Sequence, residues 1–332
     1  MNRIGLLTSG GDAPGMNAAI RAVVRTALSQ GVLVSGIERG YQGLIQGAVI
    51  ELTSRSVADT IQRGGTILRT ARSDEFRTPE GQAKAIATLK RYGIDGLVLL
   101  GGDGTFRGAY DLTQAGIATV SIPCTIDNDI ACTDQSVGFD TAVNTVVEAM
   151  NKIRDTATSH ERTYVIEVMG RHSGYIALHA GLCGGAESIL IPEVPIDLDA
   201  VCDRVTFGYR VGKNHSIVLV AEGIGNDSKY NRNPGESAAT YVANYIQTHT
   251  GLETRITILG HLQRGGNPTA LDRQIATRLG NEAVNLLLRG EAGKVVAMWQ
   301  NEMRVYDIMD ALAMKKAVDL QLYELSQMLS SV

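Results

Sequence analysis

The chain has 332 residues, of which 44% are hydrophobic and 20% are charged, and its formal net charge is −4. This composition is typical of a globular protein, and the negative charge excludes an overall basic surface for nucleic acid. No apolar run approaches the length of a bilayer span, which argues against a membrane protein. The length predicts two domains, each able to bury its own core.

Strand-like and helix-like segments alternate along the chain, which predicts an α/β fold with mostly parallel sheets between layers of helices. Strands are expected at 4–8, 33–37, 96–100, 118–122, 164–168, 188–191, 217–220, 255–259 and 295–299. Helices are expected after 15, from Ser56 to 64, and at 78–92, 105–116, 141–155, around 176, 201–211, 238–248, 271–288 and 318–329. The polar segment 225–237 is expected to be a surface loop.

The cysteines show no CxxC pair and no metal-like spacing; they are Cys124, Cys132, Cys183 and Cys202. Scattered cysteines without a secretory signal are typical of a reducing cytoplasm. Residues 1–8 lead directly into a strand-like run that lacks the apolar stretch of a signal peptide. We therefore expect a cytoplasmic protein.

Two glycine-rich loops, at 9–15 and 101–105, each follow a predicted strand and precede a helix. Such a loop presents backbone N–H groups and a helix N-terminus to a phosphate, although it can also be a plain tight turn. Neither loop is a Walker motif, and the glycines at 102, 104 and 108 miss the dinucleotide fingerprint by one residue. Asp103 in the second loop would repel phosphates unless Mg²⁺ lay between them; its alternative role is to cap the next helix.

Asp127 and Asp129 lie in the loop after the predicted strand 118–122. Ligands of open α/β sheets bind beyond the carboxyl ends of strands, where two acids can divide the work of base and metal or hydroxyl anchor. Asp and Asn also favour ordinary polar turns, so the stretch 123–129 has a second interpretation without chemistry.

Basic residues stand near several predicted strand ends and beside glycines, which suits bidentate phosphate binding. They are Arg69, Arg72, Arg162, Arg171, Arg255, His261 and Arg264. Any single one is more often a solvated charge, but we expect a set of them to converge on a site. Glu222, after another strand, is a candidate for binding sugar hydroxyls or a turn acid. Together these features predict phosphoryl transfer from a nucleotide without naming the acceptor.

The motifs at 9–17, 101–105, 125–129, 169–171 and 260–266 resemble, in the same order, those of bacterial 6-phosphofructokinases. The second motif alone also occurs in NAD kinases and lipid kinases, whereas the last three are specific. The resemblance implies transfer of the ATP γ-phosphoryl group to the 1-hydroxyl of fructose 6-phosphate. It also implies two Rossmann-like three-layer domains, with 1–138 and 263–313 binding ATP and 139–262 and 314–332 binding the sugar phosphate.

The resemblance assigns roles residue by residue. Asp127 would be the base, with Thr125 and Arg171 stabilising the phosphoryl group in transfer. ATP would be bound by Gly11, Arg72, Ser73, Gly102, Asp103, Gly104 and Thr105, with Asp103 toward Mg²⁺. Fructose 6-phosphate would be bound by Thr125, Ile126, Asp127, Asp129, Arg162, Met169, Gly170, Arg171, Glu222, Arg255, His261, Leu262, Gln263 and Arg264. Arg162 and Arg255 would reach in from a neighbouring subunit of a homotetramer.

Two departures from the family pattern concern the phosphoryl donor and the effector. Cys124 stands where ATP-using members have glycine and pyrophosphate-using members have lysine, whereas Gly104 matches the ATP-using group. ATP is therefore the expected donor, pyrophosphate is the alternative, and a non-catalytic sensor of nucleotide or sugar phosphate is a third hypothesis. An ADP or phosphoenolpyruvate effector site is implied at Arg21, Arg25, Arg154, Gly185, Glu187, Lys213 and His215. Basic residues usual at this site are replaced by Ser54, Val211 and Asn214, which predicts a weakened allosteric response.

Overall fold

The computed structural model describes residues 1–226 and 235–330. The chain forms two compact units, which are described separately: Met1–Thr141 with Arg264–Lys316, and Ala142–Gln263 with Ala317–Val332. The chain therefore passes from one unit to the other three times. The assignment of ATP to one unit and the sugar phosphate to the other stays a prediction.

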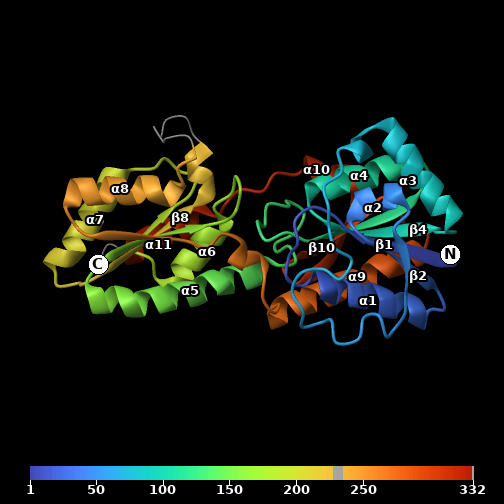
Figure 1. Ribbon diagram of the computed structural model, residues 1–332, viewed down its shortest axis with the longest axis horizontal. Coiled ribbons are helices and arrows are strands. Elements are labelled where there is room, and N and C mark those ends of the chain that lie inside the picture. Colours follow the sequence, from blue (N-terminus) through green and yellow to red (C-terminus); the bar gives the residue numbers. More distant parts are fainter. Residues whose placement is uncertain (227–234, 331–332) are drawn as a thin grey trace. The chain divides into compact units, whose positions relative to one another are not determined.

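The first unit is built on a seven-stranded sheet with the order β11-β10-β5-β4-β1-β2-β3 (Figure 1). Its strands are β1 (Arg3–Thr8), β2 (Leu33–Ile37), β3 (Val49–Leu52), β4 (Gly96–Gly101), β5 (Ala118–Pro123), β10 (Lys294–Trp299) and β11 (Glu302–Asp307). Only the edge strands β3 and β11 pair antiparallel to their neighbours. The central strands are parallel and almost wholly buried, which explains their continuous apolar sequences.

Helices cover both faces of this sheet. In Figure 1, α1 (Met16–Ser29) and α9 (Ala270–Leu288) lie together on one face. The opposite face carries α2 (Gly40–Gln46), α3 (Pro79–Arg91), α4 (Asp103–Gln114) and α10 (Ile308–Ala313). Helix α3 begins as its sequence predicts, because the Thr78 side chain accepts a hydrogen bond from the Gly81 amide and a proline occupies the first helical position.

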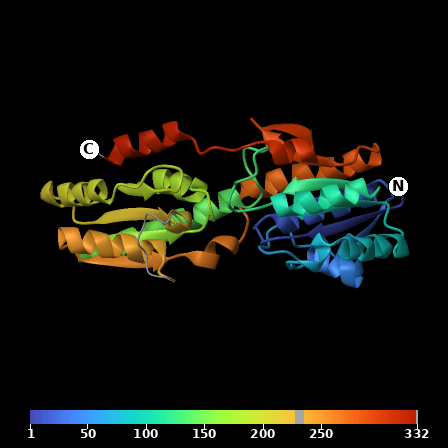
Figure 2. The same cartoon turned by 90° about the horizontal axis from the view of Figure 1, so that it is seen from above.

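The second unit has a four-stranded parallel sheet with the order β7-β8-β6-β9. Its strands are β6 (Thr163–Val168), β7 (Ser188–Leu190), β8 (Ser216–Ala221) and β9 (Thr254–Ile258). The longer helices are α5 (Phe139–His160), which begins in the first unit, α6 (Tyr175–Gly184), α7 (Leu198–Arg210), α8 (Ala238–Thr250) and α11 (Leu320–Ser330). Helix α8 packs on β6 and β9, whereas α11, red in Figure 2, packs on α6 and β7.

The predicted α/β class is confirmed, but several elements differ from expectation. The helix predicted from Ser56 does not form: residues 54–59 make turns, the Thr53 and Ser56 side chains bond to each other's backbone amides, and Asp59 has a φ of 52°. Four elements were not predicted from the sequence: α2, β3, β11 and α10. Strands β3 and β11 lie at sheet edges and are largely exposed, so they lack an apolar pattern. Residues 227–234 of the expected loop lie outside the described residues.

Within residues 1–226 and 235–330, the structure contains no helix with the length and hydropathy needed to cross a membrane. The described residues also form three short 3-10 helices: η1 (Glu75–Arg77), η2 (Glu222–Asn226) and η3 (Gly260–Arg264).

Candidate functional site

Three predicted loops meet in the first unit because their strands are neighbours. Strands β5, β4 and β1 are adjacent and parallel, so the loops that follow them share one edge of the sheet. The Ser9 amide donates to the Leu100 carbonyl at 2.9 Å, and the Cys124 amide donates to the Gly101 carbonyl at 3.0 Å. The Thr105 hydroxyl donates to the Ser9 carbonyl at 3.3 Å. The fold therefore brings the two glycine-rich loops and the Thr125–Asp129 motif together.

The loop after β4 has the features of a phosphate cradle. Gly102 is the N-cap of α4 and contributes no side-chain cap, so the first amides of the helix are not covered by a capping side chain. A Cβ added at Gly102 or Gly104 would meet no protein atom within 4 Å. Packing therefore does not require glycine at either position, and the missing side chains leave room for a ligand. Asp103 is the first helical residue, so its alternative role as the cap is wrong.

Asp103 and Asp129 form a pair of exposed carboxylates in this unit. Although residue Asp103 is exposed, desolvation of its carboxyl by the surrounding protein, followed by the negative charge of Asp129, raises its pKa. Two carboxylates close enough to repel each other suit Mg²⁺, which takes one or two protein carboxylates and leaves its other positions to water and phosphate. Within the described part of the chain, no group of three or more His, Cys, Asp or Glu side chains could enclose a metal. These residues therefore fit a Mg²⁺ ion that is bound partly by the protein and partly by phosphate, rather than a metal site enclosed by protein ligands alone.

Asp127 differs sharply from its neighbour Asp129. Its residue exposure is only 3%, and the adjacent Ile126 is fully buried. The Asp127 backbone amide donates a hydrogen bond to the Thr125 hydroxyl oxygen at 3.2 Å, as in a turn. This bond fixes the turn that carries the Asp127 carboxyl, and a carboxyl on a fixed turn is suited to act as a general base.

Cys124 carries no charge toward this site. Its side chain is 1% exposed, and burial, followed by the nearby Asp272 carboxyl, raises the pKa of its thiol well above the ordinary value. The neutral thiol cannot replace the ammonium group that pyrophosphate-using relatives are expected to have at this position. In the described residues, all four cysteines are free.

The predicted nucleotide residues and Arg264 border the loop after β1. The Thr70 hydroxyl donates to the Gly10 carbonyl at 2.6 Å, which brings the segment before Arg72 and Ser73 to this loop. Arg72 is exposed, and the Ser73 hydroxyl donates to Gln42 at 2.8 Å. The Arg264 guanidinium donates to the Asp12 carbonyl at 3.1 Å and lies against Gly11, where a Cβ would approach it within 2.6 Å.

The second unit brings its predicted residues together at the carboxyl ends of β6, β8 and β9. Glu222 Oε1 accepts hydrogen bonds from the amides of Gly170 at 3.2 Å and Arg171 at 2.7 Å. Gln263 Oε1 accepts from the Met169 amide at 3.2 Å. Glu222 and Gln263 therefore hold the Met169–Arg171 turn from its two sides, a role that the sequence did not predict.

Arg171 occupies a tight, left-handed turn. Its φ is 54° and that of Gly170 is 143°, and a Cβ on Gly223 would lie 2.4 Å from the Arg171 carbonyl oxygen. Such backbone conformations in non-glycine residues are concentrated at functional sites. The Arg171 side chain is exposed, as are those of His261 and Leu262.

Arg162 and Arg255 lie at the opposite end of these strands, so within this unit they do not converge with Arg171 and His261. Arg162 precedes β6 and Arg255 is the second residue of β9, about 20 Å of strand from the Met169–Arg171 turn. Both pair with Glu253, with 2.9 Å between Arg162 Nε and Glu253 Oε2. One copy of the unit cannot direct all these cations at one ligand.

Most of the predicted effector residues gather in the second unit, around a cavity of about 140 Å³ that Gly185, Glu187 and Lys213 help to line. Lys213 forms an ion pair with Glu187, and Arg154 donates to the carbonyls of Gly184 and Gly185. Burial lowers the pKa of His215, so its imidazole is neutral at pH 7. The remaining two predicted residues, Arg21 and Arg25, belong to α1 of the first unit.

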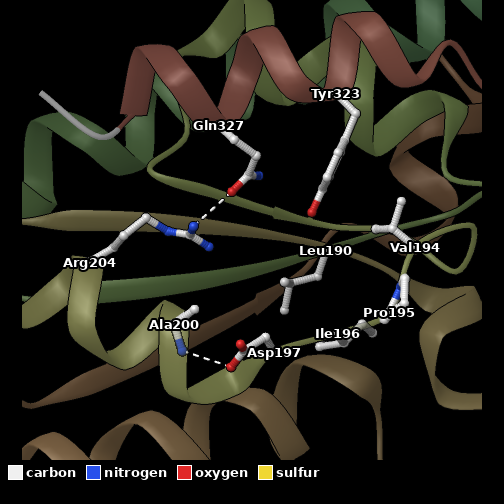
Figure 3. Close-up of a pocket in the computed structure, with 9 residues that line it drawn as sticks. All are labelled: Leu190, Val194, Pro195, Ile196, Asp197, Ala200, Arg204, Tyr323 and Gln327. Atoms are coloured by element: carbon white, nitrogen blue, oxygen red, sulfur yellow. Dashed lines mark hydrogen bonds between the residues drawn. The ribbon is translucent and has the colours of Figure 1, made fainter.

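A further cavity of about 100 Å³ lies between α7 and α11 and contains none of the predicted residues (Figure 3). Arg204 crosses it, donating to Ser188 at 3.1 Å and to Gln327 at 2.7 Å, and Asp197 caps α7 through the Ala200 amide. These contacts attach α11 to the sheet, so we interpret the cavity as part of the packing of this helix.

Three residues near the candidate site have contacts that the sequence did not predict: Asn128, Asp272 and Lys316. Each forms several hydrogen bonds with the loop that carries Asp127 or with the helix that follows it. Asn128 had a detectable signal, because asparagine tolerates positive φ and stands between two functional acids. Asp272 and Lys316 act on residues more than 130 positions away, which no local pattern reveals.

A family model described as phosphofructokinase matches residues 3–287. The chain is 56% identical over 331 residues to an ATP-dependent 6-phosphofructokinase of Halothermothrix orenii, covering 99% of this chain and all of the relative. It is 54% identical over 330 residues to the ATP-dependent 6-phosphofructokinase of Clostridium tetani, with the same coverage.

Solved structures with the same fold include phosphofructokinase from Saccharomyces cerevisiae, with a TM-score of 0.86 and 34% identity. All of this chain aligns with it, and the chain spans about half (48%) of the length of that yeast chain. A pyrophosphate-dependent phosphofructokinase from Marinobacter aquaeolei also has a TM-score of 0.86, covering 97% of this chain and 86% of its own. Its identity of 20% supports the shared fold alone.

Proposed function

The chain belongs to the phosphofructokinase family, and on that premise we propose that it transfers the γ-phosphoryl group of ATP to the 1-hydroxyl of fructose 6-phosphate in glycolysis. The observation that carries the proposal is the meeting of the glycine loop after β4 with the Thr125–Asp129 loop after β5. This arrangement supports the proposal, because a glycine loop that would bind phosphate lies beside a buried carboxyl that would accept the hydroxyl proton. A glycolytic role would place the protein in the cytoplasm.

We assign the transfer to the residues that the resemblance names. Asp127 would remove the hydroxyl proton, and Thr125 and Arg171 would donate hydrogen bonds to the phosphoryl group in transfer. Gly11, Arg72, Ser73 and the loop 102–105 would bind ATP. Met169, Glu222, His261 and Arg264, with their neighbours named above, would bind the sugar phosphate. Asp103, together with Asp129, would hold Mg²⁺, which neutralises phosphate charge when bound.

ATP is the favoured donor, because Gly104 leaves its side of the loop open and Cys124 is buried and neutral. A coupled assay that combines ATP or pyrophosphate with fructose 6-phosphate, with and without Mg²⁺, tests this proposal. We expect Mg²⁺-dependent turnover with ATP and at least about 100-fold less with pyrophosphate, a ratio equivalent to roughly 2.7 kcal/mol. Turnover with pyrophosphate but not with ATP would show that pyrophosphate is the donor. No turnover with either donor would favour the hypothesis of a non-catalytic sensor.

We propose that the active enzyme is a homotetramer with shared sites, as the resemblance implies. Strand β9 is a sheet edge that exposes Ile256 by 40% and Ile258 by 52%, next to Arg255. An apolar sheet edge with adjacent cations supports contact with another copy. Such contact would allow Arg162 and Arg255 to serve a neighbour's sugar-phosphate site. Sedimentation would measure the assembly, and a monomer with full activity would contradict it.

Arg264→Ala should raise the apparent KM for fructose 6-phosphate about 10–100-fold while kcat changes only a few-fold, since a charge-assisted hydrogen bond to phosphate is lost. Steady-state kinetics with the acceptor varied at saturating ATP provides the measurement. Arg278→Ala is the matched control, because Arg278 lies in the same unit and binds Asn301 at 2.8 Å. An unchanged KM in Arg264→Ala would remove Arg264 from the binding site.

Effector control is expected to be weak. Three usual cations are absent at Ser54, Val211 and Asn214, and Lys213 is already paired with Glu187. We therefore expect ADP or phosphoenolpyruvate to change the apparent KM for fructose 6-phosphate less than about twofold, which corresponds to about 0.4 kcal/mol of coupling. Kinetics with each effector test this expectation, and strongly sigmoidal curves that ADP makes hyperbolic would refute it.

A further inference from the structure

Asn128 stands between the two acids of the candidate site and has no role in the proposed function. Its φ of 52° places it in the left-handed region, which asparagine tolerates better than most residues. Its own exposure is 2%, so its side chain is directed into the protein rather than toward a ligand. A buried asparagine in this conformation requires partners for its amide.

The Asn128 amide braces the loop against the segment that leads into α5. Its Nδ2 donates to the Asp134 carbonyl at 3.0 Å, and its Oδ1 accepts from the Ser136 amide at 3.0 Å. The Ser136 hydroxyl in turn donates to the Thr125 carbonyl at 2.6 Å. The chain from Thr125 to Ser136 therefore closes on itself through one asparagine and one serine.

The segment to which Asn128 attaches is itself fixed. Lys316 Nζ donates to the carbonyls of Thr133 at 2.8 Å and Asp134 at 3.0 Å. The Asp134 amide donates to the Met298 carbonyl at 2.9 Å, which links the segment to β10. The Asp134 carbonyl thus receives hydrogen bonds from both Asn128 and Lys316, so Asn128 is anchored to a rigid support.

We propose that Asn128 is a positioning residue that sets the opposite environments of Asp127 and Asp129. The left-handed residue between them reverses the local chain direction, and its brace keeps Asp127 buried at 3% exposure while Asp129 faces solvent. This inference rests on the proposed function, because the position of Asp127 can affect kcat in this way only if Asp127 is the base. Displacing a catalytic group by about 1 Å can cost roughly 100-fold in rate.

The test is steady-state kinetics of Asn128→Ala and Asn128→Gly. Glycine restores the backbone freedom at positive φ but not the brace, so the pair separates the two contributions. We expect both variants to lose about 10–100-fold in kcat, with the KM for ATP and for fructose 6-phosphate within about threefold of wild type. Full activity in Asn128→Gly would show that the side-chain hydrogen bonds of Asn128 are not needed for turnover. It would overturn the proposal, because only the positive φ at position 128 would then matter.

Asn301→Ala is the matched control. Asn301 also has a positive φ, 62°, and its side chain accepts one hydrogen bond from Arg278 at 2.8 Å, but it lies in the β10–β11 turn. It should retain kcat, because Asn301 is exposed and its bond lies outside the loop that carries Asp127. Equal losses of kcat in the two asparagine variants would mean that Asn128 contributes only to the stability of the fold, and this would overturn the proposal.

Asp127→Ser, assayed in parallel, separates this inference from the proposed function. If Asp127→Ser is inactive and Asn128→Ala is fully active, only the positioning role fails. If Asp127→Ser retains turnover, the base assignment fails, and the positioning role fails with it.

Discussion

Asp127→Ser should lower kcat by about 10²–10⁴-fold, because serine cannot take the proton from the sugar hydroxyl at neutral pH. The carboxyl is buried within a braced loop, and the exposed acids nearby, Asp103 and Asp129, are assigned to Mg²⁺ instead. The KM values should change far less, since the glycine loop and the arginines still contact the phosphates. The measurement is the coupled assay at saturating ATP and fructose 6-phosphate, with calorimetry to show that the variant still binds both.

Asp111→Ser provides the matched control for this result. Asp111 lies in α4 of the same unit, is exposed, and accepts a hydrogen bond from Gln82 at 3.1 Å. It should keep kcat within about twofold of wild type, because exposed substitutions away from special features change little. Near-normal turnover in Asp127→Ser itself would remove this residue from the base role, whatever the control does.

The meeting of the loops of the candidate site could be predicted from sequence because it follows from parallel strands. Loops that begin at the carboxyl ends of neighbouring strands share one sheet edge, so Gly102, Thr105 and Asp127 needed no long-range information beyond strand order. The confirmed α/β class rests on the same alternation of buried strands and amphipathic helices. Local rules failed instead at Ser56, where side chains that bond to nearby backbone replaced the expected helix.

The supports of the site could not be predicted in this way. Asp272 bonds to Gly138 across 134 residues, and Lys316 bonds to Thr133 across 183 residues. No periodicity or motif connects such positions. Arg162 and Arg255 show that residue type alone does not place a side chain. Their charge suggested that they bind the same phosphate as Arg171, but strand direction places them at the far end of the sheet from Arg171. Residue type suggests chemistry, whereas topology decides which groups meet.

Asp272→Ala should lower the free energy of unfolding by about 3–5 kcal/mol at pH 5, because it leaves several buried donors without an acceptor. The Asp272 carboxyl accepts from the Gly138 amide and the Thr141 amide, both at 2.8 Å, and from the Thr141 hydroxyl. It therefore holds the start of α5, which follows the loop that carries Asp127. Urea denaturation followed by circular dichroism measures the effect, and turnover should fall only where the fold is lost.

The pH dependence distinguishes this buried carboxyl from an ordinary one. Burial raises the pKa of Asp272 to about 6, above the value in the unfolded chain, so its contribution is complete at about pH 4 and is lost as pH rises through 6. The stability gap between wild type and Asp272→Ala should accordingly shrink by up to about 2–3 kcal/mol between pH 4 and pH 7.

Asp95→Ala is the control with the opposite sign. Asp95 also accepts two backbone amides, from Asn2 and Arg3, but it is exposed and these bonds lower its pKa. Its contribution is therefore present at neutral pH and is lost as pH falls below the ordinary aspartate range. The stability gap for Asp95→Ala should therefore change mainly below about pH 4. If the gap for Asp272→Ala instead widened from pH 4 to pH 7, the hydrogen bonds from the three donors would outweigh burial. Asp272 would then act as a charged cap of α5.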